Sequence, residues 1–573
     1  MRKQLEKLRA QMQKQGIDIY IVPTTDYHGS EYVNDYFKCR EYISGFTGSA
    51  GTLAVTSDTA ALWTDGRYFL QAEAELSQSG IELMKEGMAG VQALEEYIEA
   101  LSKDREPHRL RLGFDGRVVS AAQGSSFEAM ADTVWDIDLA GEIWQDRPKI
   151  RPSHIYELDI SVTGETYSSK LARVRSQMAD CDFLLVTKLE QIAWLYNLRG
   201  DDIEHTPVFF AFALIGRETD TLYVMDNSFE RDNLRPYMQI FDDLKSLHNC
   251  TVSLDKSCAS YALLSCLDPS VRVIDGENPI ELMKSVKNDT EIACTRNAHI
   301  RDGIAMVKFL CWLKTNVSSS HITEISAADY LKECRRQQGA YDLSFDTIAG
   351  YEAHGAIIHY QATDRSDVQI KPGGFLLVDS GGQYRDGTTD ITRTVAPGSV
   401  TCDRKYAYTA VLKSNIRLAT ARFGYETTGA ELDSLARKPL TDRGFDFNHG
   451  TGHGVGHMLS VHEGPNTISR RGDKCRMAAG MITSDEPGVY FAGEYGIRLE
   501  NELLCTEDNG ELCFETITLC PFEREAIEAR LLSDDELEYL NRYHREVYDT
   551  LAPYLDAGEA AWLAQQTAAI TKE

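Results

Sequence analysis

In the stretch DSGGQYRDGTTDITRT, residues 379–394, Asp379 and Asp390 lie eleven positions apart on what read as two strands. The preceding GGFLLVDSGG is typical of a buried strand, GQYRDG supplies turn residues, and TTDITRT is rich in β-branched residues that favour a second strand. An antiparallel hairpin would place both carboxylates on the same side of the sheet. Because two buried carboxylates repel each other, the stretch predicts a positive charge between them.

A glycine-rich stretch, NHGTGHGVGHMLSVHEGP at 448–465, supplies candidate nitrogen ligands. His449, His453 and His457 alternate with glycines, and His462 follows. The histidines are four positions apart, as residues on one face of a helix would be. However, each of the four glycines between them would destabilise a helix interior by about 1 kcal/mol, so we do not expect a helix here. The pattern predicts an extended path that carries the three alternating histidines on one side.

Two further stretches add carboxylates: TSDEPGVY at 483–490 holds Glu486, and GIRLENELL at 496–504 holds Arg498 and Glu500. We expect Arg498 and Glu500 to lie on one strand and to point the same way, because they are two positions apart. Taken singly, the aspartate pair is compatible with turn residues and the Glu-Pro pair with a loop. Together, four carboxylates and one or more histidines suit Mn²⁺, Zn²⁺, Co²⁺ or Fe²⁺. They predict two bridged dications, whose charge would neutralise four carboxylates.

The composition indicates a soluble globular protein with two to four domains. The chain has 573 residues, 43% hydrophobic and 26% charged, and a formal net charge of −29. That charge argues against nucleic acid or an anionic membrane as a partner. The charged start lacks the apolar core of a signal peptide, and no apolar run is long enough to span a membrane. The 13 scattered cysteines, without a CxxC pair, indicate reduced thiols in the cytosol.

The first half of the chain reads as a repeat. A helix that ends at Gly16 precedes the strand IDIYIVP at 17–23, and SSKLARVRSQMADCDFLLVTK at 168–188 has the same layout. We predict two related α/β domains joined near the proline-bearing DRPKIRPS at 146–153. The alternative is that any two segments with a helix followed by a strand look alike.

The second half begins near Asn288 with a helix that Thr290 could cap, and a further helix starts near Thr323. The chain then becomes rich in strands and glycine. The C-terminal LSDDELEYLNRYHREVYDTL at 532–551 has the apolar spacing of a helix. We expect that helix to pack onto the preceding domain.

The order of these motifs resembles the pita-bread metallopeptidases of family M24, which include methionine aminopeptidase, prolidase and aminopeptidase P. TDGRYFLQA, ISGFTGSAG, GAIIHY, VHEGP and MITSDEPGVY extend the similarity over nearly the whole chain. They resemble the three-domain cytosolic type of Xaa-Pro aminopeptidase (aminopeptidase P). The resemblance implies an α/β (α+β) fold with two tandem creatinase-N-like α/β domains, 1–150 and 151–287. A pita-bread catalytic domain with a C-terminal helical extension would follow at 288–573.

The resemblance also implies a metal-ligand set within the last domain. Asp390 and Glu500 match the pair that bridges the two metals, and Glu486 matches a ligand that also accepts the proton of the attacking water. The implied ligands are Asp379, Asp390, His453, Glu486 and Glu500. The implied ions are two divalent metals per subunit, Mn²⁺ first, with Zn²⁺ or Co²⁺ as alternatives.

Further residues match positions that act on the substrate. His359 and His462 match histidines that contact substrate and assist proton transfer, and His449 matches a further substrate-contacting histidine. Arg498 matches a catalytic arginine beside the bridging glutamate, and Arg67 of DGRYF matches an arginine that approaches the substrate. One departure is His354, for which the family pattern gives no role. We expect His354 to lie in a surface loop.

The implied activity is that of an exopeptidase. It would hydrolyse the bond between an N-terminal residue and a penultimate proline, with hydroxide bridging the two metals. The resemblance further implies peptide substrates, a homodimer and a cytoplasmic location. The Xaa-Pro bond has no N–H, so it needs a dedicated site. A prolidase that splits only Xaa-Pro dipeptides is the nearest alternative. A peptidase-like binding module without catalysis is the more distant one.

Overall fold

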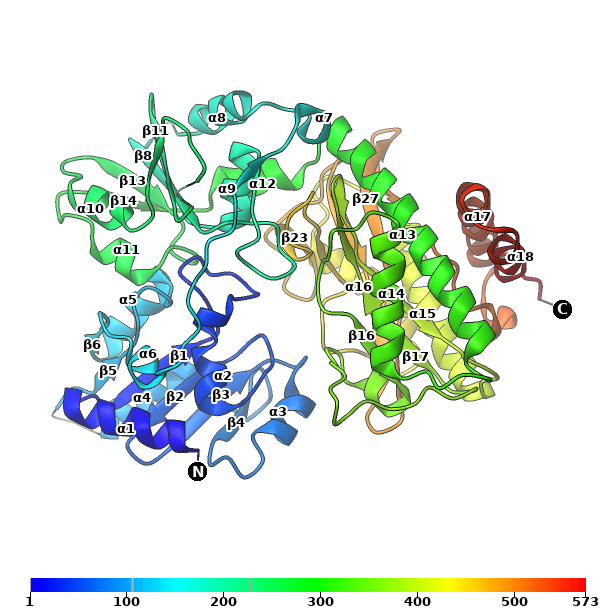
Figure 1. Ribbon diagram of the computed structural model, residues 1–573, viewed down its shortest axis with the longest axis horizontal. Helices are drawn as coiled ribbons and strands as arrows, with labels where there is room; N and C mark the ends of the chain where they lie inside the picture. Colours follow the sequence, from blue (N-terminus) through cyan, green and yellow to red (C-terminus); the bar gives the residue numbers. More distant parts are fainter. Residues whose placement is uncertain (1, 105–107, 179, 227, 573) are drawn as a thin grey trace. The chain divides into compact units, whose positions relative to one another are not determined.

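The computed structural model describes residues 2–104, 108–178, 180–226 and 228–572, and the chain forms two compact units (Figure 1). The N-terminal unit comprises Met1–Leu158 and Glu165–Glu281. The C-terminal unit comprises Asp159–Gly164 and Leu282–Glu573. Among the helices in these described ranges, none is both long and apolar enough to cross a membrane.

The N-terminal unit contains two six-stranded sheets with the same topology. Their strand orders are β4-β3-β2-β1-β5-β6 and β12-β11-β10-β8-β13-β14. In each sheet the central strand and the two after it pair antiparallel, and the remaining neighbours pair parallel. This shared topology confirms the predicted repeat, because two unrelated helix-and-strand openings would not give the same six-strand order. The strands are β1 Ile19–Pro23, β2 Thr52–Thr56, β3 Ala60–Thr64, β4 Glu82–Lys85, β5 Arg111–Gly113, β6 Asp132–Val134, β8 Phe183–Val186, β10 Ala211–Gly216, β11 Asp220–Val224, β12 Leu234–Pro236, β13 Thr251–Leu254 and β14 Arg272–Asp275, with the short pair β7 Tyr156–Glu157 and β9 Leu198–Arg199.

Equivalent helices join the two halves of this unit. Ser120 and Ser260 each cap the helix that follows them, and the two serines form an antiparallel bridge. Gly124 of the first helix lies so close to Tyr261 of the second that a Cβ would come within 2.3 Å of the ring. The predicted first helix is α1, which ends at Gly16 in the left-handed conformation. The helices are α1 Lys3–Gln15, α2 Cys39–Ser44, α3 Phe69–Glu75, α4 Leu94–Asp104, α5 Ala121–Met130, α6 Leu139–Ile143, α8 Tyr167–Ser176, α9 Leu189–Tyr196, α10 Gln239–Lys245 and α11 Tyr261–Ser265.

The C-terminal unit is built from strands that helices cover. Its largest sheet has the order β21-β28-β27-β24-β22-β23, and two three-stranded sheets have the orders β16-β17-β20 and β15-β18-β19. The strands are β15 Asp342–Leu343, β16 Ile348–Tyr351, β17 Leu376–Ser380, β18 Gly382–Tyr384, β19 Gly387–Thr388, β20 Ile391–Val395, β21 Arg422–Phe423, β22 Gly452–Gly454, β23 Glu463–Ile468, β24 Ile482–Asp485, β25 Gly488–Phe491, β26 Tyr495–Arg498, β27 Asn501–Asp508 and β28 Glu511–Thr516.

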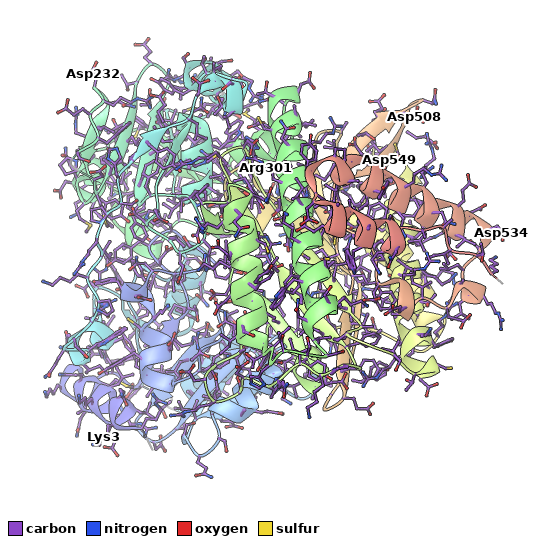
Figure 2. All side chains as sticks on the ribbon, turned by 45° about the vertical axis from the view of Figure 1, so that its right-hand side comes forward. Lys3, Asp232, Arg301, Asp508, Asp534 and Asp549 are labelled. Carbon is purple, nitrogen blue, oxygen red and sulfur yellow. The ribbon has the colours of Figure 1, made fainter. Side chains whose placement is uncertain are left out.

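The longest helix of this unit, α13, starts at a capping box. Its N-cap is Asn288, with Glu291 at the reciprocal position, so the prediction that Thr290 caps the helix was wrong. Figure 2 shows Arg301 on α13 beside the second long helix, α14. The helices are α7 Ile160–Thr163, α12 Pro279–Ser285, α13 Asp289–Asn316, α14 Glu324–Gln337, α15 Cys402–Ala419, α16 Gly429–Thr441, α17 Asp534–Leu551 and α18 Ala557–Gln566.

The predicted C-terminal helix is confirmed as α17, which runs between the labelled Asp534 and Asp549 in Figure 2. Its buried hydrophobic residues, among them Leu540 and Val547, belong to the same hydrophobic cluster as buried residues of α15. This helix is therefore part of the core of the C-terminal unit. All 13 cysteines have free thiols, as the sequence predicts.

One buried histidine of α17 makes the stability of this unit depend on pH. His544 accepts a hydrogen bond from the backbone N–H of Phe522 at its Nε2, 3.2 Å away. Burial, and then the charges of Arg393 and Arg524, lower the pKa of His544 to about 3. The unfolded chain takes up a proton at this side chain below its ordinary pKa of about 6.5, and the folded chain does not. The stabilisation is therefore complete above about pH 6.5 and is lost as the pH falls towards 3.

We predict that His544→Gln reduces the acid sensitivity of the C-terminal unit. Between about pH 7.5 and 5.5, the wild-type melting temperature should fall by roughly 3 °C more than that of the variant, since one pH unit below the unfolded pKa corresponds to about 1.4 kcal/mol. Thermal scans at the two pH values measure this difference. The exposed His321→Gln is the matched control, and it should follow the wild type. Equal falls for all three proteins would contradict the prediction.

Candidate metal centre

The predicted hairpin is present, and it brings Asp379 and Asp390 to one face. Asp379 lies on β17, and Asp390 immediately precedes β20. The two strands pair antiparallel with Asp379 opposite Thr392. Asp390 and Thr392 are two positions apart, so Asp390 is the diagonal neighbour of Asp379 on the same face.

The other three predicted ligands come from distant parts of the chain. His453 is the middle residue of β22, and Glu486 directly follows β24. Glu500 lies between β26 and β27, so the prediction of one continuous strand through Arg498 and Glu500 was wrong. The strand breaks there because the backbone N–H of Glu500 donates to the carbonyl of Thr392, 3.0 Å away.

These five side chains converge into overlapping groups of ligand atoms. Within each group the ligand atoms lie within 4.8 Å of one another. Asp390, His453 and Glu500 each belong to two groups, so the set can surround two neighbouring positions. His462, predicted to contact substrate, joins one group. The groups are Asp379, Asp390 and Glu500; His453, Glu486 and Glu500; and Asp390, His453 and His462.

The charge balance of this cluster fits divalent cations. Oδ1 of Asp379 and Oδ1 of Asp390 are buried and have no hydrogen-bond partner among the described residues. Burial, and then the neighbouring carboxylates, raise the pKa of Glu500 well above its ordinary value. Burial also raises the pKa of Asp379 and of Glu486, against the charges of Arg498 and His453 respectively. Buried acceptors without donors, in a set of four carboxylates and a histidine, are what two dications require.

The pKa of His453 also indicates that this cluster needs positive charge. Burial acts to lower the pKa of His453, but its hydrogen bond to Asp390 and the charge of Glu486 raise the pKa to about 9. Its Nε2 lies 3.5 Å from a carboxylate oxygen of each. A metal ion bound here would take the place of that proton, because only the neutral imidazole ligates.

Arg498 joins the ligands into one network. Its Nη2 donates to Oδ2 of Asp379 over 2.6 Å, and its Nε donates to Oγ1 of Thr392 over 3.2 Å. Thr392 in turn donates to Oε2 of Glu500 over 2.7 Å. Arg498 therefore binds Asp379 directly and contacts Glu500 through Thr392. It does so although Arg498 and Glu500 do not lie on one continuous strand.

The candidate substrate histidines lie around this network at different positions. The ring of His462 is 4.4 Å from that of His453, edge to face. Nε2 of His449 lies 2.8 Å from the hydroxyl of Tyr490, which also accepts from Arg498. His359 lies in the turn after the short helix η2, Glu352–Ala356.

Two histidines differ from the sequence-based expectation. His457 does not share a side with His449 and His453: its Nδ1 lies 3.3 Å from Oγ1 of Thr295 and its Nε2 3.1 Å from the carbonyl of Val162. The extended path ends after three residues, because the pairing of β22 shifts register at His453. The expectation that His354 lies in a surface loop was also wrong, because its ring contacts the buried carboxylate of Glu324.

Arg67 belongs to the N-terminal unit and is held within it. Its Nε and Nη2 donate to the two oxygens of Asp65 over 2.9 and 2.8 Å, and its Nη1 lies 3.3 Å from Glu31. This fork orients the guanidinium. Its approach to a substrate stays a prediction.

Glu502 forms a buried support behind Asp390 that was not expected from the sequence. Oε1 of Glu502 accepts a hydrogen bond from the backbone N–H of Asp390 over 2.7 Å, and Oε2 of Glu502 lies 3.2 Å from Nε2 of His299 on α13. Glu502 is two positions after Glu500, so the alternation in GIRLENELL could have indicated it. Nothing in the local sequence marks His299.

A second missed support holds the glycine-rich loop. The ammonium of Lys284 pairs with Oε2 of Glu463, next to His462, and both side chains are only 2% exposed. Lys287 donates to the carbonyl of Val455 over 2.6 Å. Gly456 lies in this loop, and a Cβ at this position would come within 2.5 Å of Oε1 of Glu463, so a larger residue would displace that carboxylate. Two lysines of the segment before α13 therefore anchor both ends of the loop that connects His453 to His462.

Comparisons with known proteins agree with this architecture. Family models match as follows: Creatinase/Prolidase N-terminal domain at 4–148 and again at 146–291, Metallopeptidase family M24 at 293–507, and the C-terminal region of peptidase M24 at 510–570. The two creatinase matches cover the two repeated sheets, and the M24 match contains all five converging side chains.

Curated relatives match over nearly the whole chain. "Probable Xaa-Pro aminopeptidase P" of Laccaria bicolor is 37% identical over 98% of this chain and 92% of its own. "Xaa-Pro aminopeptidase 1" of Dictyostelium discoideum is 38% identical over 97% of this chain and 94% of its own.

Solved structures give the same result. The X-prolyl aminopeptidase of Caenorhabditis elegans, described as a cytosolic enzyme with a di-nuclear active site, matches with a TM-score of 0.94 and 32% identity over 99% of both chains. The prolidase of Pyrococcus horikoshii matches with a TM-score of 0.50 and 25% identity, over 63% of this chain and 100% of its own. With its tandem creatinase-like domains and its converging carboxylates, the chain belongs to metallopeptidase family M24.

Proposed function

We propose that this protein is an Xaa-Pro aminopeptidase, which hydrolyses the bond between an N-terminal residue and a penultimate proline. The observation that carries the proposal is the convergence of five side chains into overlapping groups, in each of which the ligand atoms lie within 4.8 Å of one another. These side chains are Asp379, Asp390, His453, Glu486 and Glu500. This cluster lies in a chain that is similar over its full length to proteins named for that activity.

The length of the similarity distinguishes an aminopeptidase from a dipeptidase. The prolidase of Pyrococcus horikoshii leaves more than a third of this chain unmatched, since it covers 63% of it. The aminopeptidase of Caenorhabditis elegans covers 99%. The dipeptidase alternative is therefore not favoured, and a peptide that continues beyond the proline is the proposed substrate.

The proposed cofactor is a pair of divalent ions held by the five converging side chains, with Asp390 and Glu500 as the bridging pair. We assign Mn²⁺ first, with Zn²⁺ or Co²⁺ as alternatives, because carboxylate oxygens outnumber the nitrogen donor and oxygen-rich sites suit manganese. Bound there, the two ions would lower the pKa of a water molecule and polarise the substrate carbonyl.

The protein side chains transfer protons, stabilise the substrate carbonyl and orient the ligands. Glu486 accepts the proton of the attacking water and passes it towards the leaving nitrogen. His462, beside His453, and His359 donate hydrogen bonds to the substrate carbonyl as it gains negative charge. Arg498 orients Asp379 through a 2.6 Å contact, and its charge favours the ionised form of that carboxylate against the effect of burial. His449, fixed by Tyr490, is assigned to substrate contact.

A proline substrate explains the number of histidines. The Xaa-Pro bond carries no N–H, so a site that grips that group gains nothing here. The leaving group is a secondary amine that must be protonated, and histidine is the side chain that transfers protons near neutral pH. We further propose a homodimer in the cytoplasm, with Arg67 approaching the substrate. Size measurement and fractionation test the first two assignments.

We predict that removal of metal abolishes turnover. Dialysis against a chelator should reduce Arg-Pro-Pro hydrolysis to background, since no side chain alone supplies the electrostatic stabilisation of two dications. Reconstitution with Mn²⁺, Zn²⁺ or Co²⁺, followed by metal analysis and assay, ranks the ions and should recover two per subunit. Full turnover in a sample shown to be free of metal would exclude the proposed mechanism.

We predict that Asp390→Asn lowers kcat/KM for Arg-Pro-Pro by about two orders of magnitude or more, because a bridging carboxylate becomes a neutral amide. The matched control is Asp386→Asn in the same hairpin. Asp386 pairs with Arg301 at a partly exposed position, so its loss should change kcat/KM by about twofold or less. Equal activity of the two variants would remove Asp390 from the metal centre.

We predict a preference for tripeptides over dipeptides. Binding energy from residues beyond the proline should raise kcat/KM for Arg-Pro-Pro over Arg-Pro by about tenfold or more. Parallel assays of the two peptides on one enzyme preparation measure the ratio. A ratio below one would restore the dipeptidase alternative.

A further inference from the structure

One buried carboxylate fixes the segment that leads from β16 to His359. Glu324, the first residue of α14, has a fully buried side chain. Its Oε1 accepts from the backbone N–H of Tyr351 over 2.7 Å, and its Oε2 accepts from the hydroxyl of Tyr360 over 2.9 Å. Nδ1 of His354 lies 2.9 and 3.0 Å from the two oxygens. The start, middle and end of the segment 351–360 are therefore bound to a single group.

His354 makes two kinds of contact in this cluster. Its Nδ1 donates to Glu324, and its ring stacks on Tyr360 with 4.4 Å between ring centroids and 25° between planes. Its side chain is 26% exposed, so it covers a carboxylate that is otherwise enclosed. His354 therefore connects Glu324, through a hydrogen bond, to Tyr360, through a ring stack.

The same segment is held from a second direction. Glu352 has a φ of 53°, a left-handed conformation that is unfavourable for a non-glycine residue. Its carboxylate binds both Nη atoms of Arg404, 2.5 and 2.6 Å away, and accepts from the backbone N–H of Phe375 over 2.6 Å. A strained backbone that specific contacts hold in place is typical of segments that position a functional group.

His359 lies between two residues that these contacts immobilise. The carbonyl of Ile358 accepts from Nη2 of Arg498, 3.4 Å away, and Arg498 also binds Asp379. Tyr360 packs in a buried cluster with Leu377, two positions before Asp379 on β17. A shift of Tyr360 would therefore move His359 relative to the metal-binding strands.

Among the residues that the structure describes, Glu324 has four donors. Three belong to the segment 351–360, and the fourth is the N–H of Val368 at 3.4 Å. We infer that His354 is a positioning residue. Through its hydrogen bond to Glu324, which also binds Tyr360, it orients His359 for its contact with the substrate. This inference rests on the proposed function, because it assigns a purpose to the orientation of His359.

Two substitutions separate the contacts of His354. His354→Asn keeps a nitrogen donor near the position of Nδ1 and loses the ring, whereas His354→Phe keeps the stack on Tyr360 and loses the donor. We expect His354→Phe to lower kcat for Arg-Pro-Pro by about tenfold with a smaller change in KM, because misplaced groups weaken the transition state most. His354→Asn should keep kcat within about twofold. A kcat within about twofold of wild type for His354→Phe would overturn the inference.

A double-mutant cycle tests whether the effect passes through His359. In the His359→Ala background, His354→Phe should change kcat by less than about twofold, because the group that it positions is gone. The same tenfold loss in both backgrounds would show a general structural role instead. Should His354→Phe not fold, Tyr360→Phe removes the other side-chain hydrogen bond to Glu324 and carries the same two expectations.

Hydrogen exchange gives a readout that does not depend on the reaction. Amides of the peptide 352–362 should exchange faster in His354→Phe than in wild type or His354→Asn, and unchanged exchange would overturn the inference. A wild-type protein that fails to cleave Xaa-Pro peptides would instead overturn the proposed function. The two failures are thus distinguishable.

Discussion

Mutual repulsion among buried carboxylates is the constraint on which the centre depends. Ligand atoms of Asp379, Asp390 and Glu500 lie within 4.8 Å of one another, and burial raises the pKa of Glu500 well above its ordinary value. Arg498 contacts only Asp379 among them directly. Without further positive charge such a group would take up protons. Two divalent cations would instead keep all the carboxylates ionised and available as ligands.

Buried side chains of α13 and their partners hold Asp379 and Asp390 in place. Helix α13 contributes His299, which lies against Glu502, and Asp302, which pairs with Arg335 over 2.7 Å. Glu502 binds the backbone of Asp390, and Arg335 donates to the carbonyl of Ser380, next to Asp379, over 3.3 Å. The two aspartates are therefore each connected through one buried pair of side chains to the same helix. Such pairs cost desolvation, and their contribution here is to orientation.

The sequence predicts features that depend on local pattern and misses those that depend on distant contacts. The Asp379–Asp390 hairpin follows from strand and turn composition within sixteen residues. The break before β27 arises from a hydrogen bond between Glu500 and Thr392, far away along the chain. His354 was expected at the surface because the family pattern gives it no role, and its contact with Glu324 was missed because Glu324 lies thirty positions earlier. The choice of His453 over its neighbours came from family resemblance, since alternating glycines alone do not distinguish the histidines.

Anomalous diffraction from crystals grown with Mn²⁺ tests the central claim most directly. We expect two anomalous peaks roughly 3.5–4 Å apart. Each should lie about 2.0–2.2 Å from ligand atoms of the five side chains, with oxygens of Asp390 and Glu500 next to both peaks. A single peak, or peaks that none of these carboxylates contacts, would contradict the account.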